Sequence, residues 1–144
     1  ELLAASDILT LHVPGGEKTR NLISGQEFAG MKDGAVLINT SRGSVVDVKA
    51  LVRALGGGKV AAAGLDVLPE EPAVKEEAEL IRSIFKKQYD LEALLSDHIL
   101  LRLRNVYITP HSAFNTCEAL ERILETTAAN IRAFIEGKPR NTVF

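Results

Sequence analysis

The sequence predicts an α/β fold built on a parallel β-sheet. Short apolar runs rich in β-branched residues alternate with segments of helical periodicity along the chain, which is the pattern of strand–helix–strand units. The run from Val60 to Leu65 is almost entirely apolar, as expected of a parallel strand covered on both faces. A length of 144 residues suits one domain with a sizeable core.

The composition is that of an ordinary globular protein, with 46% hydrophobic and 25% charged residues. A net charge of -2, with basic and acidic residues interleaved, gives no electrostatic footprint for nucleic acid or an anionic membrane. The single cysteine, Cys117, cannot form an internal disulfide, and no segment is long and apolar enough to cross a bilayer. We therefore expect a cytoplasmic protein without nucleic-acid or membrane partners.

Turn and cap signals bound the first elements. Residues 1–5 have the character of a helix end, and residues 7–13 form a β-branched run that a proline and two glycines stop. The Ser24–Glu27 stretch has capping-box spacing, which predicts a short helix beginning there. The apolar run 35–39 predicts the second strand.

The middle of the chain predicts a helix and a third strand. Asp47 is placed as the N-cap of this helix, glycines 56–58 end it, and the strand follows at 60–67. The stretch 56–61 formally fits the G-x-G-x-x-G/A phosphate fingerprint. It follows a helix and precedes a strand, however, which is the reverse of what phosphate binding at a helix N-terminus needs. We therefore reject it as a phosphate loop.

The last part of the chain predicts an insertion, a strand and a helix. Residues from about 73 to 104 are charged and helix-prone, so we expect a helical insertion that interrupts the sheet. Residues 106–109 predict a fourth short strand. Asn115, three residues before Glu118, predicts the start of a C-terminal helix at about 116–136.

Three ionisable side chains follow the predicted strands: Arg42 after the second, Glu71 after the third and His111 after the fourth. Because parallel strands end along one edge of a sheet, these side chains can converge. A guanidinium can bind a carboxylate through two parallel hydrogen bonds, and a histidine oriented by a carboxylate is a natural proton donor near neutral pH. Taken singly, each has a plainer explanation: Arg42 and Glu71 as solvated loop residues, His111 as a structural residue.

The other polar residues support fewer functional conclusions. His12 and His98 are better explained as structural residues, and the three separated histidines and one cysteine lack metal-ligand spacing. Asp66 ends an apolar strand, where a carboxylate needs a partner to offset its desolvation. It therefore predicts a ligand amide or a neighbouring cation close by.

The sequence resembles the NAD-dependent D-isomer-specific 2-hydroxyacid dehydrogenases. The resemblance is carried by Ser6-Asp7-Ile8 through His12-Val13-Pro14, Thr19-Arg20, Met31-Lys32 through Ile38-Asn39-Thr40-Ser41-Arg42-Gly43, Gly64-Leu65-Asp66-Val67 through Glu71-Pro72, Thr109-Pro110-His111 and the final helix. It implies a Rossmann-like NAD-binding domain that is partial: its C-terminal part spans 1–144, and the glycine fingerprint and most of the substrate domain would lie upstream. The long segment between Glu71 and His111 is most similar to that of D-lactate dehydrogenases.

The resemblance also implies roles for individual residues. Arg42 would bind the substrate carboxylate, His111 would donate and accept the proton, and Glu71 would pair with His111. The implied NAD contacts are Val13, Pro14 and Thr19 on the adenosine side, Thr40, Ser41 and Arg42 near the nicotinamide, and Asp66 near its carboxamide.

The expected function is NAD-dependent hydride transfer between a D-2-hydroxy acid and its 2-keto acid, with D-lactate and pyruvate favoured. Without the glycine-rich phosphate turn, the chain alone is expected to bind NAD weakly and to show little or no activity. The alternative is a non-catalytic oligomerisation module or a corepressor-like interaction module. An uncovered strand edge and uncovered helix faces would in either case favour a homodimer or higher self-association.

Overall fold

The computed structural model describes residues 1–69 and 91–142 of the chain. The chain divides into two compact units, Glu1–His111 and Ser112–Phe144. The first unit holds the β-sheet, and the second is built around one long helix.

The sheet of the first unit has four parallel strands. They are β1 (Ile8–Leu11), β2 (Ala35–Asn39), β3 (Val60–Leu65) and β4 (Val106–Ile108). Their order in the sheet, β1-β2-β3-β4, is their order in the sequence, and each neighbouring pair is parallel. The predicted α/β class with a parallel sheet is therefore confirmed, although each strand except β2 is shorter than predicted.

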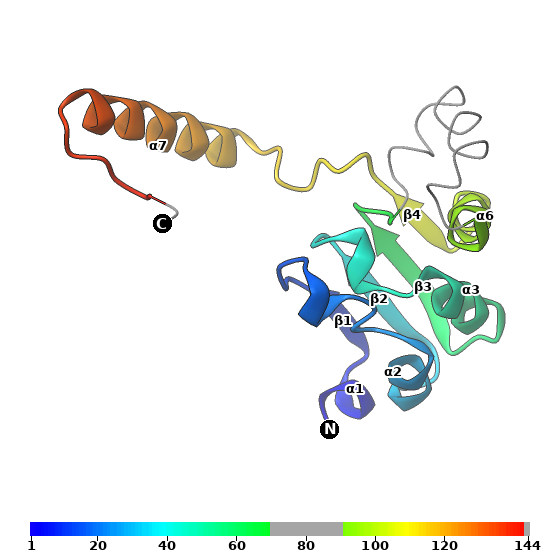
Figure 1. Cartoon of the computed structure of the whole chain (residues 1–144). Helices are drawn as coiled ribbons and strands as arrows, with labels where there is room; N and C mark the ends of the chain where they lie inside the picture. Colours follow the sequence, from blue (N-terminus) through cyan, green and yellow to red (C-terminus); the bar gives the residue numbers. More distant parts are fainter. Residues whose placement is uncertain (70–90, 143–144) are drawn as a thin grey trace. The chain divides into compact units, whose positions relative to one another are not determined.

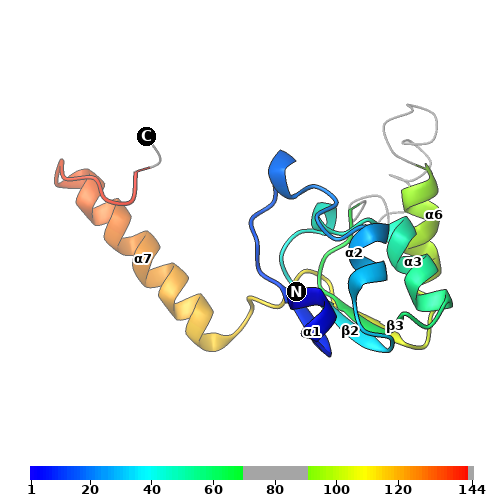
Figure 2. The ribbon, with the colours of Figure 1, turned by 90° about the horizontal axis from the view of Figure 1, so that it is seen from below.

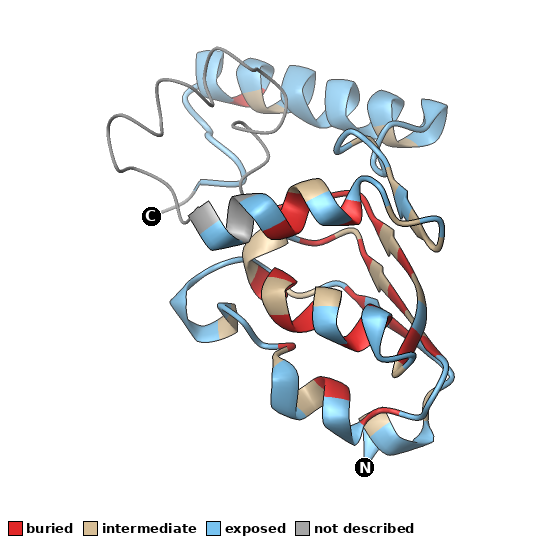
Figure 3. Cartoon of the chain, turned by 90° about the vertical axis from the view of Figure 1, so that its right-hand side faces the viewer, coloured by how far each residue is buried: buried red, intermediate tan, exposed pale blue. Residues whose placement is uncertain are grey.

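Three helices of the first unit lie side by side over the same face of the sheet, as Figures 1 and 2 show together. These are α2 (Gly25–Gly30), α3 (Val48–Gly56) and α6 (Leu91–Leu100), whereas the short helix α1 (Leu2–Ala5) precedes β1. The largest fully buried apolar side chains of this layer are Leu37, Leu51, Leu100, Val45 and Val60. Figure 3 shows the buried residues on the strands and on the helix sides that face them.

The opposite face of the sheet is open within the described residues of this unit. Ile8 is 60% exposed and Tyr107 is 73% exposed, although both belong to strands. Ala61 is exposed and Ala62 is half-buried, so the prediction that the third strand is covered on both faces is wrong for the described residues. Small apolar side chains give a strand an all-apolar sequence without requiring a covering layer, and this explains the error.

The local signals for the helix starts are confirmed. The capping box at the start of α2 is present, with the Glu27 carboxylate accepting hydrogen bonds from the Ser24 amide at 3.0 Å and from the Ser24 hydroxyl. The Asp47 carboxylate caps α3 by accepting from the amides of Lys49 and Ala50. Gly58 has φ +74° in the turn between α3 and β3, a left-handed conformation that favours glycine.

The second unit consists of α7 (Cys117–Ile135) and the tail that follows it. Its N-cap is Thr116, whose hydroxyl accepts from the Ala119 amide at 3.2 Å, so the start predicted from Asn115 shifts by one residue. Several large apolar side chains of α7 are exposed: Leu120, Ile123, Leu124, Ile131, Phe134 and Ile135.

The predicted insertion at about 73–104 falls partly on residues outside those described. Its described part holds α6. An ion pair of 2.9 Å between Lys49 of α3 and Glu92 of α6 connects the two helices. In the described ranges, no helix has both the length and the apolar character needed to span a membrane.

The capping box at α2 predicts a pH-dependent contribution to stability. The hydrogen bond from the Ser24 hydroxyl, followed by that from the Ser24 amide, lowers the pKa of Glu27 below that of an ordinary glutamate. Because the folded-state pKa is the lower one, this stabilisation is present above the unfolded pKa and is lost as pH falls through the folded value. The variant Ser24→Ala should raise the pKa of Glu27 toward the ordinary value.

Carboxyl-carbon NMR titrations of the wild type and Ser24→Ala would measure this pKa. Asp33 serves as the internal control, because its pKa is lowered by Lys59 and not by Ser24. An unchanged Glu27 titration in the variant would contradict the assignment.

Candidate functional site

The turn after β2 places Arg42 at the carboxyl edge of the sheet. Asn39 is the last residue of β2 and is 1% exposed. Its side-chain Oδ1 accepts from the Ser41 amide at 3.0 Å and from the Ser41 hydroxyl at 2.7 Å, and its Nδ2 donates to the carbonyl oxygen of Arg42 at 3.0 Å. The chain therefore leaves the strand in one defined turn through Thr40 to Arg42.

The Arg42 side chain is exposed, and its aliphatic part lies close to Gly15 in the loop that follows β1. Its Nη1 donates to the carbonyl oxygen of Ser41 at 2.6 Å. A Cβ at Gly15 would lie 2.8 Å from Cγ of Arg42, so this loop can approach the arginine stem because residue 15 has no side chain. The side chain is thus a cation at a strand end, as predicted, with its aliphatic part against the neighbouring loop.

Gly43 brings the turn after β2 against the chain that follows β3. A Cβ at residue 43 would overlap the carbonyl carbon of Leu68 and the backbone nitrogen of Pro69. Backbone atoms cannot move aside as a side-chain tip can, so this approach requires glycine. The contact sets the position of Arg42 relative to the segment that leads toward residue 70.

Asp66 connects the ends of β2, β3 and β4. Its carboxylate is buried and accepts a hydrogen bond from the hydroxyl of Thr109, which follows β4. Its backbone amide donates to the carbonyl oxygen of Asn39 at 2.9 Å. One partner of the buried carboxylate is therefore a hydroxyl from the segment after β4, and the ligand amide or cation that the sequence suggests stays a prediction.

His111 follows Thr109 by two residues and is exposed. Its backbone has φ +55°, a left-handed conformation that is uncommon outside glycine, and its amide donates to the Thr109 carbonyl oxygen at 3.0 Å. Such conformations recur at functional sites, where the surrounding structure holds them in place. Glu71, the predicted partner of His111, lies outside the described residues.

The loop after β1 carries the residues predicted on the adenosine side of a cofactor. Val13 is half-buried and Pro14 is exposed. Thr19 ends the short 3-10 helix η1 (Glu17–Thr19), and its hydroxyl donates to the Pro14 carbonyl oxygen at 2.7 Å. This bond closes the loop on itself beside the edge of the sheet.

A row of contacts therefore crosses the carboxyl edge of the sheet. It runs from Gly15 to Arg42, from Asn39 to Asp66, and from Asp66 to Thr109. The structure thus brings the described site residues after β1, β2, β3 and β4 to one edge, as the parallel topology predicted. An exposed guanidinium there can bind an anion, and an exposed imidazole can transfer a proton.

Three residues of this row are not marked as site residues by the sequence. Asn39 ends a predicted strand, and no pattern in a single sequence marks a buried amide that bonds to the next turn. Thr109 ends the fourth predicted strand, and its partner Asp66 is distant in the sequence. Gly15 is predicted only as a turn residue. The one signal that the sequence offers is that polar residues end neighbouring parallel strands.

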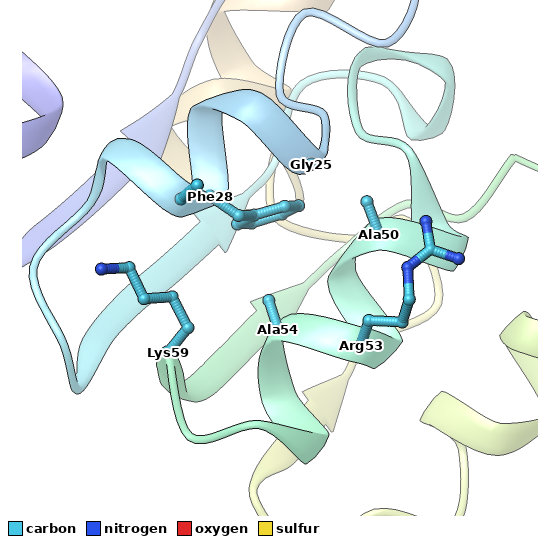
Figure 4. A pocket seen from close by; sticks show the side chains of 7 residues that line it. Gly25, Phe28, Ala50, Arg53, Ala54 and Lys59 are labelled. Carbon is cyan, nitrogen blue, oxygen red and sulfur yellow. The ribbon is translucent and has the colours of Figure 1, made fainter.

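A pocket of about 460 Å³ lies elsewhere, between α2 and α3. Figure 4 shows Phe28, Ala50 and Ala54 lining it, with Arg53 and Lys59 also at its wall. It contains none of the predicted site residues, and Lys59 is paired with Asp33 at 2.8 Å. Within the residues described, no group of three or more His, Cys, Asp or Glu side chains could hold a metal ion.

Comparison with known families gives a match over most of the chain. The family described as "D-isomer specific 2-hydroxyacid dehydrogenase, NAD binding domain" matches residues 1–113. This range covers the sheet unit and ends just after His111.

Individual relatives match nearly the whole chain. A glyoxylate reductase of Thermococcus litoralis is 41% identical over 143 residues, which cover 99% of this chain and 37% of the relative. D-3-phosphoglycerate dehydrogenase 1 of Saccharomyces cerevisiae is 40% identical over 144 residues, which cover 99% of this chain and 29% of the relative. The chain thus spans less than two fifths of the length of these curated relatives.

A solved structure also matches nearly the whole chain. The D-lactate dehydrogenase of Aquifex aeolicus, complexed with NAD and lactic acid, superposes with a TM-score of 0.77 at 40% identity. The match covers 95% of this chain and 39% of that one.

The backbone contact at Gly43 yields a direct test of the site's construction. The variant Gly43→Ala should lower the free energy of unfolding by about 1–3 kcal/mol, because the new methyl group overlaps the Leu68–Pro69 backbone. Gly25→Ala is the matched control, since a Cβ at Gly25 has no neighbour within 4 Å and alanine is the better helix former. Denaturant unfolding followed by circular dichroism measures both, and equal stability of the two variants would contradict the close approach.

Proposed function

We propose a function from one established premise: this chain belongs to the D-isomer-specific 2-hydroxyacid dehydrogenase family, through its NAD-binding domain. The proposed reaction is hydride transfer between NAD(H) and a D-2-hydroxy acid or its 2-keto acid. NAD is the cofactor of the family, in agreement with the sequence prediction. We propose that residues 1–144 form the C-terminal part of the dinucleotide-binding domain, with the helical insertion at about 73–104 and the final helix at about 116–136.

The observation that carries the proposal is the row of contacts along the carboxyl edge. The row includes the exposed Arg42 after β2 and the buried Asp66 carboxylate after β3, and the exposed His111 follows its last member, Thr109, by two residues. Ligands of open parallel sheets bind in the crevice outside these strand ends. This is the edge where a nicotinamide and a keto acid would have to meet.

The described residues fit a nicotinamide cofactor. The Asp66 carboxylate is buried and held by Thr109, and a carboxylate can accept several hydrogen bonds at once, including one from a carboxamide. Thr40 and Ser41 lie in the same turn as Arg42 and would face the nicotinamide side. The loop with Val13, Pro14 and Thr19 would lie on the adenosine side.

The proposed mechanism divides the work among three side chains. Arg42 binds the carboxylate of the substrate and polarises the keto oxygen, so that the carbonyl carbon becomes the better hydride acceptor. His111 in its imidazolium form gives a proton to that oxygen, and Glu71 pairs with His111 and favours the charged form. NADH, when bound, supplies the hydride. In the reverse direction His111 takes the hydroxyl proton.

The substrate class follows from what Arg42 can recognise, a carboxylate beside a carbonyl or hydroxyl carbon. D-Lactate and pyruvate are the favoured pair, since the neighbouring structure from Aquifex aeolicus is a D-lactate dehydrogenase. The glyoxylate reductase among the relatives supports the broader class of small 2-keto acids. Cofactor binding by this chain alone is expected to be weak, because its only glycine-rich stretch precedes a strand.

We also propose a cytoplasmic location, which the free Cys117 thiol supports. The alternative function remains a non-catalytic oligomerisation or corepressor-like module, favoured by the exposed apolar side chains of α7. The two functions differ in whether Arg42 and His111 affect turnover.

Substitutions of these two residues should separate the two functions. Arg42→Ala should lower kcat for keto-acid reduction by about 10²–10³-fold and raise KM for the keto acid. His111→Ala should lower kcat by about 10²–10⁴-fold. Arg53→Ala and His98→Ala are the matched controls, because both lie on helices that cover the sheet face.

The measurement is NADH oxidation with pyruvate, glyoxylate and a larger 2-keto acid, using the complete gene product that contains this sequence. Unchanged turnover in both site variants would refute the catalytic assignment and favour the interaction module.

Self-association is proposed from the apolar surface that each unit exposes. In the sheet unit, Ile8 and Tyr107 lie on the open face. In the second unit, Phe134 is 76% exposed, and Ile131 beside it is exposed as well. Apolar surfaces of this kind are commonly buried against another chain.

Light scattering should therefore detect a dimer or a larger species. The double variant Ile131→Ser, Phe134→Ser should raise the dissociation constant at least tenfold, since each apolar side chain contributes about 1.5–3 kcal/mol when fully buried. Glu125→Ser on the same helix is the control. A clean monomer at high wild-type concentration would contradict the proposal.

A further inference from the structure

We infer that Asn39 is the positioning residue for Arg42, and that its buried amide sets the turn that presents the guanidinium to the substrate carboxylate. The inference rests on the proposed function, because it assigns a purpose to the Arg42 turn. Asn39 itself would touch neither substrate nor cofactor.

The hydrogen bonds of Asn39 span the whole turn. Its Oδ1 holds the amide and the hydroxyl of Ser41, and its Nδ2 holds the carbonyl oxygen of Arg42. The polar groups on both sides of the Arg42 Cα are therefore fixed to one side chain. This requires an acceptor and a donor on the same short group, and the asparagine amide has both.

The burial of Asn39 makes these bonds energetically important. Asn39 is 1% exposed, so no water can replace a hydrogen-bond partner that its amide loses. Conformations of the turn that break these hydrogen bonds are therefore disfavoured. The Arg42 side chain, by contrast, is exposed. A fixed backbone under a long side chain restricts where the guanidinium can reach, and catalysis is sensitive to such placement.

Asn39 also fixes the turn relative to the rest of the edge. Its backbone carbonyl oxygen accepts from the Asp66 amide at 2.9 Å, so the residue that orients Arg42 is bonded to the residue proposed for the nicotinamide side. Its strand partners are Leu11 and Leu65. Asn39 thereby sets the spacing between the Arg42 turn and Asp66 in the proposed site.

A purely structural role would give a different kinetic result. Loss of overall stability would reduce the amount of folded protein, which lowers the apparent kcat and leaves the KM values for keto acid and NADH unchanged. Loss of Arg42 placement acts more strongly on the keto acid than on NADH, because the guanidinium is proposed to bind the keto-acid carboxylate whereas the nicotinamide has further proposed contacts at Thr40 and Asp66. The ratio of the two KM effects therefore separates the roles.

The test compares Asn39→Ala, Ser41→Ala and the wild type in the complete gene product, well below the unfolding temperature of the variants. Asn39→Ala should raise the keto-acid KM roughly tenfold or more, as expected for lost hydrogen bonds to a buried group, and leave the NADH KM within about twofold. Ser41→Ala removes one of the three bonds and should have a smaller effect in the same direction. Ser96→Ala, a buried serine that bonds the Glu92 carbonyl oxygen on α6, should change neither constant.

A second measurement keeps this inference distinct from the proposed function. Amide hydrogen exchange of the present chain should show faster exchange of the Ser41 amide in Asn39→Ala, by at least tenfold, with the Ala63 amide in β3 unchanged. If the wild type reduces no keto acid, the proposed function fails while the exchange result still reports on the turn. Equal Ser41 exchange in variant and wild type, or equal KM effects on both substrates, would overturn the inference.

Discussion

The buried hydrogen bonds between strand ends are the constraint on which the site depends. Asn39 and Asp66 lie in an otherwise apolar part of the fold, and each bonds to a neighbouring strand end or turn. Leaving the amide or the carboxylate unpaired there would cost more free energy than either hydrogen bond contributes when it forms. The penalty for breaking these bonds therefore keeps the arrangement in place. These hydrogen bonds consequently connect the strand ends along the edge of the sheet, and the exposed Arg42 and His111 follow two of those strand ends.

Charge and burial are divided between different residues at this edge. The buried polar residues of the Arg42 turn are the neutral Asn39 and Ser41, whereas the guanidinium stays exposed. Burying an unpaired cation would cost several kcal/mol, whereas a buried amide with its partners in place costs little. The fold thus keeps a full positive charge available for an anion without placing that charge in the interior.

The sequence predicted what depends on neighbouring residues. The Ser24 capping box, the Asp47 cap and the parallel α/β pattern all follow from spacing over a few positions, and the structure has each of them. Contacts between distant segments were not predictable in this way. The hydroxyl of Thr109 as the partner of Asp66 and the approach of Gly43 to Leu68 exist only once the strands are aligned.

The order of the strands has a consequence for how the protein is made. Because β1, β2, β3 and β4 are neighbours in the sheet in the order in which they are translated, each new strand finds its partner among residues already synthesised. The pairs β1–β2 and β2–β3 have the shorter sequence separations, which favours rapid pairing, whereas β4 pairs with β3 across residues 66–105. The Asn39 turn gains its bond to Asp66 only when β3 has emerged, and Asp66 gains Thr109 only after β4. The site would therefore be completed strand by strand during synthesis, with Arg42 set in place before the histidine arrives.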